Sequence, residues 1–470
     1  MYAGAVTEAH TLGELRRAEY RVQPIKSELR HNLIRKLQAG EKLFPGILGY
    51  ESSVIPQLEN AILAGQDIVL LGERGQAKSR LVRSLTSLLD EAVPAIAGCE
   101  INDNPYAPTC RRCRDLVAES GDETPIAWLA AADRYGEKLA TPDTSIADLI
   151  GEVDPIRVAE GRYLSDELVI HYGLVPRTNR GIFAINELPD LAERIQVGLL
   201  NIIEERDVQI RGFRIRLPLD VFVVATANPE DYTNRGRIIT PLKDRFGAQV
   251  RTHYPRTVED EIAIAEQEHV VFEDMPVPVH MPQHMKEIAV EITHLARRHP
   301  QINQRSGVSV RVTTANYESL VSSALRRALI TREREAVVRV SDLAAVPPST
   351  AGKVELDTWE DTDDDQVLDK VVRSACNNVF RRHFSTQELA DLVQRFDSGG
   401  FTVEVGPLLP AESYREAIEA LPGLDRARDK LGEPDSPQAM AAVLEFVLEG
   451  LHLSKRLNKT ALEGTSVYAG

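Results

Sequence analysis

The sequence predicts an α/β fold in which helices cover both faces of a parallel sheet. Its expected strands are three continuous apolar runs, at Asp67–Leu71, in "GIFAINE" (181–187) and in "DVFVVATAN" (220–228). Each run is bounded by polar or turn residues, and helical patterns lie between the runs. Continuous apolar runs of this kind are typical of parallel strands that are buried on both faces.

Length and composition indicate an ordinary globular protein. The 470 residues are enough for two to four domains, and 43% are apolar and 27% charged. No apolar run is long enough to span a bilayer, and the N-terminus lacks the apolar stretch of a signal peptide, so we expect a cytoplasmic protein without membrane contact. The net charge of −16 argues against a general binder of polyanions.

The chain divides by pattern into five segments. Short β-type runs around Gly161 and Gly173, and an alternating pattern around Gly212, predict hairpins. After about residue 256 the pattern becomes mainly helical, until a proline pair and an acidic run interrupt it. We therefore expect an N-terminal helical segment (1–40), an α/β core (41–256) with insertions at about 92–145, 150–181 and 206–220, a helical region (257–346), an acidic linker (347–366) and a C-terminal helical region (367–470).

The segment "GERGQAKS" (72–79) lies between a predicted strand and a predicted helix, which is the context of a phosphate-binding loop. Lys78 would reach the β- and γ-phosphates, and the Ser79 hydroxyl would ligate Mg²⁺. Ala77 stands where the strict pattern has glycine, so we expect right-handed helical backbone there, since only a left-handed position demands glycine. A chance glycine-rich turn is the alternative. The expected nucleotide contacts are Gly72, Glu73, Arg74, Gly75, Gln76, Ala77, Lys78, Ser79 and Arg80.

Polar side chains follow the other two predicted strands. Asn186 and Glu187 end one strand, and Thr226 and Asn228 end the next. Open α/β sheets bind ligands at this edge, so Glu187 is a candidate for polarising an attacking water. Asn228 could hydrogen-bond both the γ-phosphate and that water. The alternative for Glu187 is a cap on the following helix.

Four cysteines are too few for a disulfide scaffold in a chain of this length. Cys99, Cys110 and Cys113 lie close together in sequence, and a Cys-x-x-Cys pair with a third thiol could hold structural Zn²⁺. Tetrahedral coordination needs a fourth ligand, yet Cys376 is remote and no histidine is near. Reduced, half-buried thiols in a loop are the alternative.

With these motifs, the chain resembles the AAA+ ATPases of the branch that contains MoxR proteins and the ATPase subunit of magnesium chelatase. The resemblance covers about Leu48 to Val346 and depends on the three strand-end motifs, on Ala77 before the lysine and on the two hairpin insertions. It implies a P-loop AAA+ core with β-hairpin insertions, followed by an α-helical lid at 257–346. The first forty residues and the C-terminal region lie outside the resemblance.

The same resemblance assigns roles to single residues. It implies that Glu187 is the catalytic glutamate and that Asn228 is sensor 1. Arg245, in "TPLKDRFGAQV", matches the position of an arginine finger that completes the site of a neighbouring subunit. Arg311, in "SGVSVRVTTANYESL", matches sensor 2, with Arg305 as the competing candidate. A surface ion pair is the alternative for each arginine.

Asn186 stands where such ATPases have aspartate. Its amide oxygen can still accept a hydrogen bond from a water on Mg²⁺, but it supplies no negative charge. A pair of unit charges about 4 Å apart is worth roughly 4 kcal/mol at an effective dielectric of about 20, before desolvation. We therefore predict weakened Mg²⁺ binding and slow turnover.

The expected function is that of a homo-oligomeric ring of six copies that binds ATP and Mg²⁺ and remodels a partner protein. The resemblance implies a separate protein with a von Willebrand factor A domain as that partner. Asn186 and Ala77 leave open a non-hydrolysing nucleotide switch or scaffold. A nucleic-acid motor is a third reading, because Arg211, Arg214 and Arg216 lie in the second hairpin. The acidic net charge and the lack of interleaved aromatic residues argue against it, so we expect no nucleic-acid partner.

Overall fold

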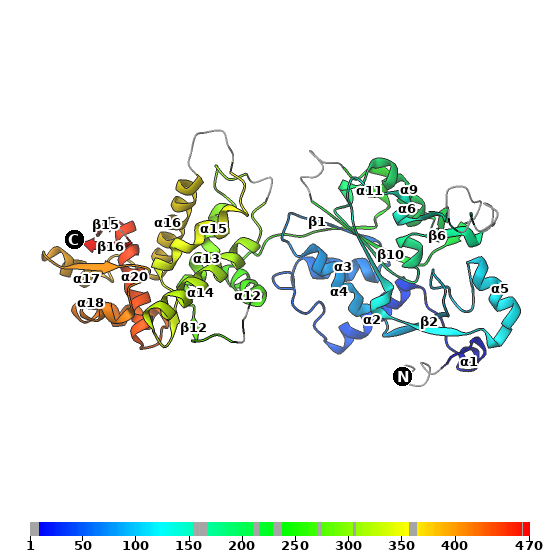
Figure 1. Ribbon diagram of the computed structural model, residues 1–470, viewed down its shortest axis with the longest axis horizontal. Coiled ribbons are helices and arrows are strands. Elements are labelled where there is room, and N and C mark those ends of the chain that lie inside the picture. The colour runs from blue at the N-terminus through cyan, green and yellow to red at the C-terminus, as the bar shows by residue number, and fades with distance from the viewer. Residues whose placement is uncertain are drawn as a thin grey trace. The chain divides into compact units, whose positions relative to one another are not determined.

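The computed structural model describes residues 9–154, 156, 159, 167–205, 207–209, 216–228, 237–270, 272, 274–303, 307–356, 364–462 and 464–470. The chain forms two compact units, Met1–His253 and Tyr254–Gly470 (Figure 1). The first unit contains the α/β core, and the second is mainly helical.

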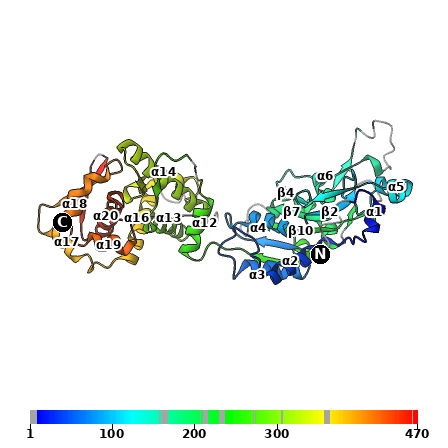
Figure 2. The same cartoon turned by 90° about the horizontal axis from the view of Figure 1, so that it is seen from below.

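A five-stranded parallel sheet lies at the centre of the first unit (Figures 1 and 2). Its strand order is β11-β1-β10-β7-β4. Ile68 pairs with Val224, and Val224 pairs with Ala184, so the middle of the sheet is apolar in register. The carboxyl ends of the strands meet at one edge. The bounds are β1 Ile68–Leu71, β4 Tyr135–Leu139, β7 Gly181–Asn186, β10 Val221–Ala227 and β11 Ala248–Arg251.

Alternate residues of each strand face opposite sides of the sheet, so each strand contributes to two cores. Ile68 and Leu70 pack with α2, α3 and α4, whereas Val69 and Leu71 belong to a core that includes the apolar face of α9. This arrangement confirms the predicted α/β sandwich with helices on both faces. The helices of this unit are α1 Leu12–Arg17, α2 Ile25–Ala39, α3 Val54–Leu63, α4 Lys78–Ser84, α5 Arg111–Ser120, α6 Ile146–Leu149, α8 Leu174–Arg177, α9 Glu193–Glu204 and α11 Thr240–Arg245.

Three small antiparallel pairs extend from the core. They are β2 (Ala92–Ile96) with β3 (Ile126–Ala130), β5 (Gly151–Val153) with β6 (Ile170–Tyr172), and β8 (Asp207–Gln209) with β9 (Arg216–Pro218). The expected insertion at about 92–145 contains β4, which the structure places in the central sheet itself, parallel to β7. The sequence does not predict this strand, because Glu137 and Lys138 interrupt "YGEKL" and the other strands are continuous apolar runs.

The second unit has one large core that joins the expected lid to the C-terminal region. The expected linker at 347–366 is partly helical, because its first residues lie in α15 and its last in α16. A three-stranded antiparallel sheet in the order β14-β16-β15 accompanies the C-terminal helices and was not predicted. The elements are α12 Val258–Glu268, β12 Val279–His280, α13 Gln283–Ala296, α14 Arg311–Thr331, β13 Ala336–Val337, α15 Val346–Ala351, α16 Asp364–His383, α17 Ala390–Asp397, β14 Thr402–Val405, α18 Arg415–Ala420, α19 Leu424–Leu431, α20 Pro437–Leu453, β15 Asn458–Leu462 and β16 Thr465–Ala469.

Within the described residues, no helix combines the length and the apolar character that crossing a membrane would require.

Candidate nucleotide site

The glycine-rich segment forms the loop between β1 and α4, as the sequence predicts. Gly75 has φ +74°, which suits glycine. Ala77 has φ 54° and ψ 18°, so the expected right-handed backbone at this position is wrong. The tight turn into α4 requires left-handed backbone at the residue before the lysine whichever side chain is present. A non-glycine residue in this region costs roughly 1–2 kcal/mol, and the rest of the loop must hold it there.

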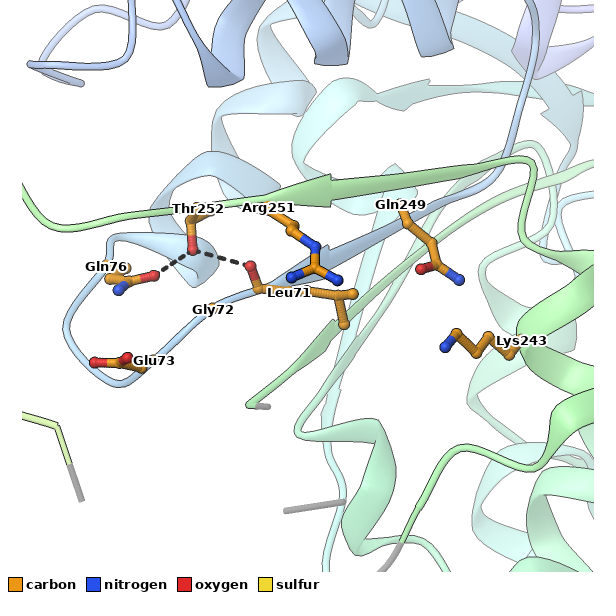
Figure 3. Close-up of a pocket in the computed structure, with 8 residues that line it drawn as sticks. All are labelled: Leu71, Gly72, Glu73, Gln76, Lys243, Gln249, Arg251 and Thr252. Carbon is orange, nitrogen blue, oxygen red and sulfur yellow. Dashed lines mark hydrogen bonds between the residues drawn. The ribbon is translucent and has the colours of Figure 1, made fainter. Parts of the chain in front are cut away.

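Close packing holds the loop against the end of β11. A Cβ atom at Gly72 would lie 1.8 Å from Oγ1 of Thr252 and 2.2 Å from Oε1 of Gln76, so any other residue would displace these two side chains. The Thr252 hydroxyl donates to Gln76 Oε1 over 2.7 Å (Figure 3). The Tyr50 hydroxyl lies 2.9 Å from the carbonyl oxygen of Gln76 and 2.8 Å from that of His253. These contacts fix the loop from both sides.

A cavity of about 320 Å³ opens beside this loop. Figure 3 shows the Lys243 and Arg251 side chains in its lining, next to the strand that leads into the loop. Two cationic groups beside this glycine-rich loop suit an anionic ligand. The full lining consists of Leu71, Gly72, Glu73, Gln76, Lys243, Gln249, Arg251 and Thr252.

Lys78 is buried, and its ammonium group is held by oxygen atoms. It donates to the carbonyl oxygen of Gly72, to that of Glu73 over 2.8 Å and to Oδ1 of Asn228 over 2.6 Å. Ser79 is half-buried in the first turn of α4, whereas Arg74 and Arg80 are exposed. The lysine thus connects the loop directly to the end of β10.

Asn228 links Lys78 to Glu187. Its amide nitrogen donates to Oε2 of Glu187 over 2.8 Å while its amide oxygen accepts from Lys78. The backbone N–H of Glu187 donates to the Thr226 hydroxyl over 3.0 Å, and Glu187 itself has φ 56°. Lys78, Asn228 and Glu187 come from three separate segments of the chain. The structure therefore joins, by hydrogen bonds, three residues that the sequence predicts to act together.

Asn186 contacts a carboxylate that sequence analysis missed. Its Nδ2 donates to Oε1 of Glu137 over 2.5 Å, and its Oδ1 lies 3.4 Å from the Thr226 hydroxyl. Glu137 lies on β4, in register with Ala184 two residues before Asn186. Side chains two apart in a strand share a face, which is why Glu137 and Asn186 meet.

Glu137 carries negative charge at neutral pH. Arg83 on α4 donates to both of its carboxylate oxygens, over 2.8 and 3.0 Å, and the Tyr135 hydroxyl donates over 3.0 Å. The Arg83 hydrogen bonds hold the pKa of the Glu137 carboxyl below its ordinary value. The charge that Asn186 lacks is therefore present on the neighbouring strand.

The donor set fits Mg²⁺. Hydroxyl, amide and carboxylate oxygens are the ligands that this ion prefers, and it usually keeps several waters beside one or two carboxylates and substrate phosphates. Ser79, Asn186 and Glu137 would supply one oxygen type each.

The two candidate arginines lie in different units. Arg245 ends α11 and donates through Nε to Oε2 of Glu204 over 2.7 Å, with about a third of its side chain exposed. Arg311 begins α14 in the second unit and is exposed. Arg305 lies outside the described residues, as do Arg211 and Arg214 of the second hairpin and the side chain of Arg216. The roles of the arginines stay predictions.

The three clustered cysteines meet in the first unit. Cys99 Sγ lies 4.0 Å from Cys110 Sγ, and Cys113 lies one helical turn further along the start of α5. All four cysteines of the chain, including the buried Cys376, are free thiols.

No model of a known protein family matches the chain. Among curated proteins, the magnesium-chelatase 38 kDa subunit of Cereibacter sphaeroides is 28% identical over 234 residues, which are 47% of this chain and 61% of that protein. Magnesium-chelatase subunit ChlI of Nostoc is 27% identical over 237 residues, which are 48% of this chain and 58% of that protein. The chain thus spans about three fifths of the length of these relatives.

Among solved structures, a complex between subunits BchI and BchD of magnesium chelatase aligns with 69% of this chain and 98% of its own, at 20% identity and a TM-score of 0.36. The relationship to these proteins depends on the sequence matches. Those matches show that just under half of the chain is similar to magnesium-chelatase subunits, in agreement with the resemblance that its motifs indicate.

Proposed function

We propose that this protein is an AAA+ ATPase that binds ATP with Mg²⁺ and hydrolyses it slowly to remodel a partner protein. The observation that carries the proposal is the hydrogen-bonded chain from Lys78 through Asn228 to Glu187. A lysine for the phosphates, an amide for the γ-phosphate and a carboxylate for the water are the groups that phosphoryl transfer to water needs.

Each residue has a distinct task in this proposal. Lys78 leaves its carbonyl partners and neutralises the β- and γ-phosphates, which releases Asn228 to contact the γ-phosphate. Glu187 then accepts a hydrogen bond from the attacking water and orients it in line with the leaving oxygen. Mg²⁺, when bound, neutralises charge that develops on the phosphate oxygens.

Glu137 also affects the predicted slow turnover, because its carboxylate lies beside Asn186. The amide nitrogen of Asn186 donates to Glu137, and its amide oxygen, which the Thr226 hydroxyl approaches at 3.4 Å, has a second lone pair for a water on the metal. The Glu137 carboxylate provides negative charge near the metal, but Arg83 partly neutralises that charge. We therefore propose that Mg²⁺ binds more weakly than with an aspartate at position 186, and that hydrolysis is retained.

We also propose that active sites form between copies in a ring of six. Arg245 is partly exposed, and it contacts Glu204, Asp244 and the carbonyl oxygen of Pro241. A surface ion pair is worth about 0–1 kcal/mol, so Arg245 can exchange these partners for a phosphate on a neighbouring copy. The names of the relatives favour magnesium chelation as the process served, with a separate von Willebrand factor A domain protein as the partner. MoxR-like maturation of another complex is the related alternative.

The test is steady-state phosphate release by the full-length protein at saturating ATP and Mg²⁺. Wild type should release phosphate, and Glu187→Gln should abolish release while nucleotide binding persists. The opposite candidate is a non-hydrolysing switch, which Asn186 and the strained Ala77 favour. Nucleotide binding without any release above the Glu187→Gln background would establish the switch and exclude the motor.

A further inference from the structure

We propose that the first unit holds one structural metal ion of the zinc type, bound by Cys99, Asp103, Cys110 and Cys113. This site is independent of the proposed ATPase activity. All four residues lie in one short segment: Cys99 follows β2, Asp103 is four residues later, Cys110 caps α5 and Cys113 lies in its first turn. Asp103 supplies the fourth ligand that a search for cysteine and histidine does not find.

The spacing of the ligand atoms matches a single ion. The three sulfur atoms and one Asp103 carboxylate oxygen all lie within 4.8 Å of one another. Around a tetrahedral zinc with Zn–S bonds of about 2.3 Å, sulfur atoms stand roughly 3.8 Å apart. The observed 4.0 Å between the sulfurs of Cys99 and Cys110 is close to that value. A cluster of several iron atoms would hold its ligands further apart.

Asp103 has an environment that a metal explains. Its side chain is fully buried, and among the residues that the structure describes no ion pair involves it. Its Oδ1 accepts from the Thr109 hydroxyl over 2.5 Å, and its Oδ2 accepts from the N–H of Cys110 over 3.0 Å. A carboxylate that stays ionised when buried needs a compensating positive charge, and a divalent cation would supply it. The two hydrogen bonds orient the carboxylate toward the thiols, as outer partners of metal ligands do.

Backbone groups also support thiolates at this site. The N–H of Asp103 lies 3.4 Å from the sulfur of Cys99, and the N–H of Cys113 lies 3.4 Å from the sulfur of Cys110. Cys110 and Cys113 are buried and Cys99 is half-buried, so four protein ligands can enclose the ion without water. A closed site of four protein ligands is structural rather than catalytic.

A disulfide or simple packing of the thiols accounts for this cluster less well than a bound ion does. A disulfide needs sulfur atoms about 2.0 Å apart and would leave the third thiol unpaired. Packing of apolar thiols explains the buried cysteines but not a fully buried carboxylate among them. A bound ion explains both, and it would close the loop between β2 and α5 in the way that a disulfide closes a loop.

The experiment measures metal content of the full-length protein, produced without an affinity tag that binds metal. Elemental analysis should find about one zinc per chain, and release by a mercurial reagent should follow titration of the thiols. Cobalt should give the visible spectrum of a tetrahedral thiolate site, and zinc should displace it. Cys376→Ala, which removes the remote buried cysteine, should leave metal content and spectrum unchanged.

Asp103 variants make the result specific to the fourth ligand. Asp103→Ala should weaken zinc binding at least roughly tenfold, as loss of an orienting partner alone does. Asp103→Cys should restore one zinc per chain and shift the cobalt spectrum toward that of a four-thiolate site. The proposal requires that wild type and Asp103→Cys both bind zinc. These two proteins therefore test it even if Asp103→Ala does not fold. Less than a tenth of an equivalent in both, or a mass that shows a disulfide, would overturn the proposal.

Discussion

At the scale of single residues, the informative contact is the hydrogen bond between Asn186 and Glu137. It explains how an asparagine can stand at the position where the AAA+ resemblance implies an aspartate. An aspartate at position 186 would face a second carboxylate at hydrogen-bonding distance, and like charges so close cannot both stay ionised without a cation. Glu137 therefore supplies the negative charge, and Asn186 the hydrogen bond, that a single aspartate would supply.

This division predicts a reciprocal pair of variants. Glu137→Gln should lower the Mg²⁺ affinity of the nucleotide-bound site roughly tenfold, because the site loses the negative charge of Glu137. Asn186→Asp with Glu137→Gln should restore or exceed wild-type affinity, whereas Asn186→Asp alone should gain less because of repulsion. Titration of Mg²⁺ against a fluorescent nucleotide measures this, with Glu91→Gln as an exposed control. Equal affinities for wild type and Glu137→Gln would refute the role of Glu137.

The left-handed backbone of Ala77 predicts a stabilising substitution. Ala77→Gly removes a strain of roughly 1–2 kcal/mol, and the greater freedom of glycine in the unfolded chain takes back roughly 0.4–1 kcal/mol. The free energy of unfolding should therefore rise by about 0.5–1 kcal/mol in urea denaturation. Ala118→Gly, at an exposed position inside α5, should lower it by about 1 kcal/mol. A loss at both positions would show that Ala77 is not strained.

At the scale of elements, α13, α16 and α20 pack around a buried histidine. Among the residues that the structure describes, neither ring nitrogen of His284 has a hydrogen-bond partner, and the ring stacks on Phe446 with ring centroids 4.5 Å apart. Burial lowers the pKa of His284 to about 3 from its ordinary value of 6.5, and His383 and His280 add to the effect. Those two histidines are paired with Glu287 and Glu433. His284 is thus neutral in the folded protein.

This predicts acid sensitivity of the second unit. Between pH 6.5 and pH 3 the unfolded chain binds a proton at His284 that the folded chain does not. The stabilisation is complete above pH 6.5 and is lost as the pH falls, by about 2 kcal/mol at pH 5. Urea unfolding of wild type and of His284→Leu at pH 7 and pH 5 measures the difference. The leucine variant should lose about 2 kcal/mol less on acidification; an equal loss would assign the sensitivity to other groups.

Sequence reasoning succeeds for elements whose signal is local. The strands β1, β7 and β10 are continuous apolar runs, and the loop before Lys78 is a contiguous motif, so each could be recognised in isolation. It fails where the determining contact is remote in sequence. Glu137 meets Asn186 only because β4 pairs with β7, and β14 gains its place only by pairing with β16 some sixty residues later. The role of Asp103 likewise depends on a loop that folds back on itself.

At the scale of the whole molecule, the proposal requires that each nucleotide site be completed by another copy. In a ring, one surface of each copy meets a different surface of the next, so a residue far from its own site can serve its neighbour's. Arg245 ends α11 on the surface, with its ion pair to Glu204 partly exposed to solvent. An arginine finger contributes roughly three to five orders of magnitude to turnover, so its loss is measurable even in a slow enzyme.

Mixing two inactive variants tests this arrangement. Lys78→Ala lacks the phosphate-binding lysine but retains Arg245, whereas Arg245→Ala has an intact site but no finger to offer. Each alone should be inactive, and random mixed rings should contain intact sites at about a quarter of their interfaces, with phosphate release recovered in proportion. Arg237→Ala, which removes another exposed ion-paired arginine, should retain wild-type activity by itself. Native mass spectrometry shows whether mixed rings form. If they form and phosphate release stays at background, Arg245 does not act between copies, because Lys78 of one copy and Arg245 of the next are then both present and still do not form an active site.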